Sequence, residues 1–124
     1  MAEKINWNFV AQALKGPSIT GVGSLDVESY EKIDFKIPKT LTHDVTVSDV
    51  SKVSLLIIST ITPDKLITFK GNPVLPIGDC ELDNSLILVG NVAQDFLKAD
   101  TVLTFTNGTD KEIEIQMLIG RNAI

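Results

Sequence analysis

The segment at residues 25–37 alternates between apolar and polar side chains, and this alternation constrains the fold more than any other feature. Its odd positions include the apolar residues Leu25, Val27, Ile33, Phe35 and Ile37, and its even positions include the charged residues Asp26, Glu28, Lys32, Asp34 and Lys36. A period of two residues is that of an extended chain with one face buried and the other in water. Because this segment exceeds the usual length of a strand, we expect a bend at residues 29–31.

Two further segments, 52–61 and 85–89, are apolar on both faces, which is typical of strands in the middle of a sheet. Pro63 follows the first of them at the second position of a predicted type I turn, where its fixed φ is favourable. We therefore expect residues 66–70 to return as the second strand of a hairpin. Pro73 and Pro76 predict an edge strand or an irregular segment at residues 74–78.

Residues 101–105 and 112–119 predict a closing hairpin around the dipeptide Asn107-Gly108. A two-residue loop would set the apolar face of one strand against the acidic face of the other. A three-residue loop at 106–108 instead places the odd positions of both strands on one face, so we favour this longer loop.

The composition agrees with an all-β chain, because valine, isoleucine and threonine make up 36 of the 124 residues. A helical pattern appears near residues 92–98, where Asn91 can cap a short helix. The length fits one domain. We predict a jelly-roll-like antiparallel β-sandwich at residues 18–124, with a small closed β-barrel as the alternative. An N-terminal arm at residues 1–17 precedes it.

The net charge of −5 argues against partners that carry many phosphates, and Arg121 is the only arginine. Nucleic-acid binding and anionic membrane surfaces both favour basic faces, so we expect neither partner. The longest apolar stretch, 53–61, is too short to span a bilayer. The N-terminus lacks a secretory signal pattern, and the single cysteine excludes an internal disulfide. We expect the protein in the cytoplasm or in a virion assembled there.

No pattern of residues predicts catalysis or a bound cofactor. His43 is the only histidine, and no strained nucleophile motif accompanies it. Gly21 and Gly23 lack the third glycine and the following helix of a phosphate-binding loop. Cys80 lies between two acids that should raise its thiol pKa, which makes it a poor nucleophile. We therefore predict a protein that is not an enzyme and that needs no cofactor.

Asp79, Glu81 and Asp83 form the densest group of carboxylates. In an extended segment, residues two apart share one side, which is compatible with a cation site or an inverting glycosidase pair. The same spacing recurs on plainly amphipathic strands, so a solvated polar face is our first interpretation. We assign no metal site, and whether these three residues bind a cation stays open.

The two ends of the chain carry the strongest functional signal. Trp7 and Phe9 lie in the arm, which Gly16 and Pro17 separate from the rest of the chain. The C-terminal end is also apolar, although chain ends are usually polar and frayed. We therefore expect an interface at five residues, namely Trp7, Phe9, Met117, Arg121 and Ile124.

These observations predict a structural or interaction β-sandwich subunit that self-associates into a homo-oligomer. An assembly component of a virion or phage is its concrete form. The alternative is a module that binds a small molecule or a glycan, with Tyr30 and Trp7 as the aromatic candidates for stacking on a sugar. A hydrolase that uses Asp79, Glu81 or Asp83 is the third hypothesis.

Overall fold

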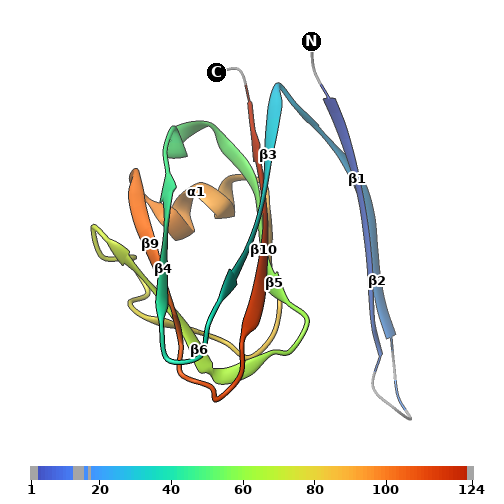
Figure 1. The fold of residues 1–124 in the computed structure, drawn as a ribbon. Helices are drawn as coiled ribbons and strands as arrows, with labels where there is room; N and C mark the ends of the chain where they lie inside the picture. The colour runs from blue at the N-terminus through green and yellow to red at the C-terminus, as the bar shows by residue number, and fades with distance from the viewer. Residues whose placement is uncertain (1–2, 13–15, 17, 123–124) are drawn as a thin grey trace.

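The main body consists of two four-stranded antiparallel sheets that pack face to face (Figure 1). The structure is a computed structural model that describes residues 3–12, 16 and 18–122. The first sheet has the order β3 (Ser29–Ile37), β10 (Ile113–Arg121), β5 (Val53–Thr60) and β8 (Leu86–Val89). The second sheet has the order β4 (Thr42–Val47), β9 (Thr101–Asn107), β6 (Asp64–Asn72) and β7 (Cys80–Leu82).

The strand pairing is that of a jelly roll. β3 pairs with β10, β4 with β9, β5 with β8 and β6 with β7, all antiparallel. Successive pairs fall alternately into the first and the second sheet, as in a long hairpin rolled up on itself. The predicted jelly-roll sandwich is therefore confirmed. Across the described part of the chain the two sheets stay separate, so the alternative of a closed barrel is wrong.

The core lies between the two sheets and follows the alternation of the strands. Phe105 is its largest fully buried side chain, and its ring packs 5.2 Å from Phe69 and 5.4 Å from Phe35, measured between ring centroids. A short helix, α1 (Asn91–Leu97), buries Ala93 and Leu97 in this core, which confirms the predicted helix. Its N-cap is Gly90 rather than the expected Asn91, and no side chain caps it.

Both hairpins predicted for the body are wrong. β5 and β6 belong to different sheets, and so do β9 and β10, so each connection crosses the sandwich. At the second connection the buried side chain of Asn107 replaces the expected hairpin turn. Its amide nitrogen donates to the carbonyl oxygens of Ile37 (3.0 Å) and Lys111 (2.7 Å), and its Oδ1 accepts from the Thr109 backbone N–H (2.9 Å). These bonds hold an arch between sheets.

The expected central strand at residues 85–89 is also wrong, because β8 is the edge strand of the first sheet. Its companion at 52–61 is confirmed, since β5 lies between β10 and β8. The segment 74–78 forms no strand, in agreement with Pro73 before it and Pro76 within it. Edge strand β8 is apolar on both faces because the outer face of the first sheet also carries apolar side chains.

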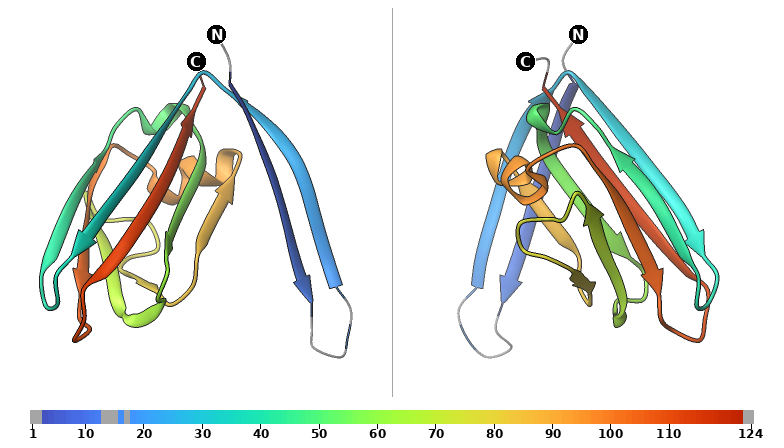
Figure 2. Two further views of the ribbon diagram at one scale, coloured as in Figure 1. Left: turned by 45° about the vertical axis from the view of Figure 1, so that its right-hand side comes forward. Right: turned by 90° about the vertical axis from the view of Figure 1, so that its left-hand side faces the viewer.

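A separate two-stranded sheet, which we call the arm, consists of β1 (Glu3–Gln12) and β2 (Ser18–Val27). β2 had been expected in the sandwich, and it pairs with β1 instead. Figure 2 shows the arm leaving the body at one end of the first sheet and diverging from it. The bend that separates β2 from β3 lies at Glu28, whose backbone N–H donates to the Arg121 carbonyl oxygen at 2.8 Å. The predicted bend at 29–31 is therefore displaced slightly.

Candidate interaction surface

The outer face of the first sheet carries apolar side chains where a soluble sandwich usually carries polar ones. Residues directly opposite on antiparallel strands share a face, so the register places these side chains in two rows. The upper row consists of Gly120, Leu55 and Val89, and the lower row consists of Leu118, Ile57 and Ile87. We call these six residues the outer apolar face. It contains no charged residue.

Polar residues border the outer apolar face on two sides. Gln116 and Ser59 are paired in the next row along β10 and β5. On edge strand β3, Lys32 lies beside the lower row and Tyr30 beside the upper row, where Tyr30 is 54% exposed. An apolar centre with a polar rim is the usual anatomy of a protein interface.

The base of the arm covers the upper row only. A Cβ atom placed on Gly120 would lie 3.0 Å from Val27 Cγ1 and 3.5 Å from Ile5 Cδ1, so both side chains of the arm pack over this glycine. Leu55, beside Gly120, is 0% exposed although it lies on the outside of the sheet. In the lower row Ile87 is 57% exposed. Burial therefore falls from the upper row to the lower one.

The arm itself has one half-buried face and one exposed face. Ile5 and Trp7 are half-buried, whereas the intervening Asn6 is exposed. The Trp7 ring lies over the opposite strand, because a Cβ atom on its ladder partner Gly23 would come within 2.5 Å of Trp7 Cζ2. Only glycine permits this placement. We call the side that carries Ile5, Trp7, Gly23 and Val27 the odd face of the arm.

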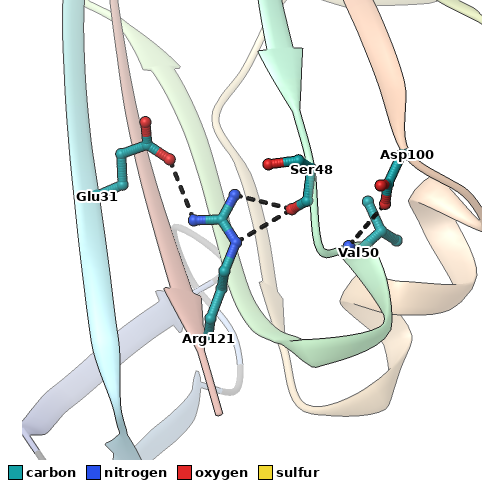
Figure 3. Close-up of polar contacts among 5 residues, drawn as sticks. All are labelled: Glu31, Ser48, Val50, Asp100 and Arg121. Atoms are coloured by element: carbon teal, nitrogen blue, oxygen red, sulfur yellow. Dashed lines mark hydrogen bonds and ion pairs between the residues drawn. The ribbon is translucent and has the colours of Figure 1, made fainter. Parts of the chain in front are cut away.

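The Arg121 side chain links β3 of the first sheet to Ser48, which follows β4 of the second sheet (Figure 3). Its Nε and Nη2 atoms donate to the Ser48 carbonyl oxygen at 3.1 and 3.0 Å, and its Nη1 lies 3.1 Å from Glu31 Oε1. The side chain is only 14% exposed. The fork of donors is therefore used within the chain, although Arg121 was one of the five residues expected at an interface. Nearby, the Val50 backbone N–H donates to Asp100 Oδ1 at 3.0 Å (Figure 3).

The other residues expected at an interface lie in different parts of the structure or outside the described residues. Met117 is 1% exposed and lies in the core, because the odd positions of β10 point between the sheets. It offers no surface to a partner, so including it was wrong. Phe9 pairs with Gly21 in the arm, but its side chain lies outside what the structure describes. Ile124 lies outside the described residues.

Sequence reasoning missed the lower row of the outer apolar face, in which Ile87 is exposed and Ile57 and Leu118 are half-buried. The signal was present, because residues 85–89 are apolar at both even and odd positions. That pattern was attributed to a central strand. An edge strand with an apolar outer side produces the same pattern, and periodicity alone does not separate the two cases.

The acidic segment lines a cavity of about 350 Å³ at the β7/β8 edge of the sandwich. Its floor includes Phe69 and Phe96, whose ring centroids lie 6.4 Å apart, and its lining includes Asp79, Glu81 and Asp83. Among the residues that the structure describes, no three His, Cys, Asp or Glu side chains are grouped closely enough to hold a metal ion.

Cys80 and His43 occupy unremarkable surroundings. Burial, and secondly the negative charge of Asp79, raise the pKa of the Cys80 thiol above its ordinary value, as the sequence predicted. Cys80 Sγ donates weakly to the Gly78 carbonyl oxygen at 3.6 Å. The exposed His43 stacks on Phe35, with ring centroids 4.2 Å apart and the planes inclined by 14°. Neither residue has a catalytic partner in the contacts that the structure describes.

Within the described ranges, no helix is long and apolar enough to cross a membrane. Comparison of the chain with protein-family models and with curated proteins finds no match.

Proposed function

We propose that this protein is a non-enzymatic structural subunit that self-associates through its outer apolar face and its arm. The observation that supports the proposal most directly is the uncharged lower row, where Ile87 is 57% exposed on a sheet from which the arm diverges (Figure 2). Complete burial of such a side chain stabilises an interface by roughly 1.5–3 kcal/mol. A cytoplasmic assembly, such as a virion or phage particle, is the setting that we propose.

Charge supports the choice of surface. Copies of a chain with a net charge of −5 repel one another, so they approach at lowest cost where charges are absent. The outer apolar face has this property. Jelly rolls occur in capsid proteins and also in lectins and cupins, so the fold agrees with the proposal without deciding it.

The test is sedimentation velocity of the full chain over a wide range of concentration. We expect a concentration-dependent oligomer that Ile87→Lys dissociates, because the substitution puts a charge into the lower row. Leu66→Lys is the matched control, since Leu66 is equally exposed (57%) but lies on β6 in the second sheet. A monomer at every concentration, or equal effects of the two substitutions, would refute the proposal.

As a second candidate, we propose a module that binds a small molecule or a glycan. The cavity supports it, because about 350 Å³ falls within the size range of ligand pockets and aromatic rings form its floor. Tyr30 is the exposed aromatic on the first sheet. The test combines a glycan array with thermal-shift screening, in which hits should weaken in Phe96→Ala or Tyr30→Ala. No hit in either screen would remove this candidate.

A further inference from the structure

The arm already shows which surface fits the outer apolar face. In each copy, Ile5 and Val27 of the odd face pack on Gly120 and bury the neighbouring Leu55 completely. The four residues Ile5, Val27, Gly120 and Leu55 are all uncharged. The same sheet face continues without interruption into the lower row, because Ile57 and Leu118 follow two residues further along β5 and β10. A surface like the odd face of the arm is therefore complementary to that row as well.

The arm of the same chain is held away from the lower row. The Glu28 backbone N–H is bonded to the Arg121 carbonyl oxygen at 2.8 Å, which fixes the point where the arm leaves the sheet. The Arg121 side chain is itself fixed by Glu31 and Ser48. From this point the arm and the first sheet diverge (Figure 2). Closing the arm onto its own sheet would have to disturb these bonds.

An unsupported two-stranded ribbon is only marginally stable in water. The arm has ten residues in each strand, so it extends for about 33 Å. Ile5 and Val27 at its base pack on Gly120 of the first sheet. Contact with an uncharged surface would therefore stabilise the arm as well as the lower row.

From these observations we infer that the odd face of the arm of one copy lies on the lower row of the outer apolar face of a second copy. The inference rests on the proposed self-association and names the two surfaces that meet. If two copies exchange arms reciprocally, this contact closes a twofold dimer. If each copy gives its arm to the next, it closes a ring or extends a filament.

The test is disulfide trapping between two populations in a Cys80→Ser background. One population carries Gly21→Cys, on the odd side of β2, and the other carries Ile87→Cys. We expect a disulfide-linked heterodimer when the two are mixed under mild oxidation. Replacing Gly21→Cys by Thr20→Cys, which lies on the exposed side of the same strand, should abolish the product.

A second measurement needs no substitution. In a mixture of differently isotope-labelled chains, intermolecular NOEs should connect the Trp7 indole with the Ile87 methyl groups. Oligomers without these NOEs and without the Gly21–Ile87 disulfide would overturn the inference and leave self-association intact. A fast-migrating monomer from a chain that carries both cysteines would also overturn it, because the arm would then close on its own sheet. A monomer in sedimentation would remove the inference and the proposed function together.

Discussion

The two sheets of the sandwich have similar inner faces and very different outer faces. Both inner faces are apolar, as a sandwich core requires. The outside of the second sheet is mainly polar apart from side chains such as Leu66, and Thr104 on β9 donates to Asp44 Oδ1 on β4 at 2.8 Å. The outside of the first sheet presents Leu118, Ile57 and Ile87 instead. The fold does not require the continuous apolar patch of the first sheet, and the base of the arm packs on the part of it at Gly120.

The largest expected effect is a difference in stability between a substitution on the inner face of β5 and one on its outer face. Leu55 and Leu56 are adjacent and both 0% exposed, but they point to opposite sides of the first sheet. We expect Leu56→Ala to lower the free energy of unfolding by about 2–5 kcal/mol, because it leaves a cavity between the sheets. Leu55→Ala should cost less, since the arm base can settle into the space. Urea denaturation measures both, and equal losses would mean that the arm base packs as rigidly as the core.

A smaller effect is expected at the junction of the arm with both sheets. Arg121→Ala should lower the free energy of unfolding by about 1–3 kcal/mol, because it removes charge-assisted hydrogen bonds from a side chain that is only 14% exposed. Lys32→Ala is the control, since its ion pair with Asp34 is long (3.6 Å) and exposed. It should change stability by less than about 0.5 kcal/mol. Similar values for the two variants in urea denaturation would contradict a special role for Arg121.

The arm should respond to substitution without affecting the body. Gly23→Ala places a methyl group where the Trp7 ring lies, at 2.5 Å from Cζ2, so the ring must move. Because Trp7 is the only tryptophan, its fluorescence spectrum should shift while the urea midpoint of the body stays unchanged. Ser24→Ala, at an exposed arm position, is the control. An unchanged Gly23→Ala spectrum would show that the ring is not fixed on this glycine.

The smallest effect concerns the β7 edge of the second sheet. Because burial and Asp79 raise the pKa of the Cys80 thiol on folding, the folded state favours the protonated thiol. The higher pKa of the folded state leaves the free energy of unfolding unchanged at low pH. It lowers that free energy as the pH rises above the pKa of the unfolded chain, about 8.5. Alkylation by iodoacetamide should have its inflection at higher pH in the folded chain than in urea. Asp79→Asn should lower the pH of this inflection only partly, since burial is the larger cause of the raised pKa. A return to the inflection measured in urea would contradict this order of causes.

The sequence predicted the layers of the molecule better than their connections. Alternation at residues 25–37 correctly identified a buried and a wet face, because side-chain direction is a local property. Whether the next strand stays in the same sheet is not local. The turn residues at Pro63 and Asn107 are equally compatible with a hairpin and with an arch, and the buried bonds of Asn107 that select the arch join residues up to seventy positions apart.

The candidate surface was predicted only in part for the same reason. Trp7 was identified as an arm residue because Gly16 and Pro17 follow it. Its partner strand, β2, was assigned to the sandwich, since alternation does not say which sheet a strand joins. Met117 was chosen for its position near the apolar end of the chain, although its odd position on β10 places it in the core.

The buried Asn107 also has a consequence for the chemical ageing of the protein. Asparagine followed by glycine is prone to deamidation, in which the next backbone nitrogen attacks the side-chain amide. Here that nitrogen, on Gly108, donates to the Leu66 carbonyl oxygen at 2.9 Å, and the amide of Asn107 is held by the arch. Folding therefore protects this dipeptide, whereas an unfolded chain loses the protection. Aspartate at this position, detected by mass spectrometry in aged material, would record the time that a molecule has spent unfolded.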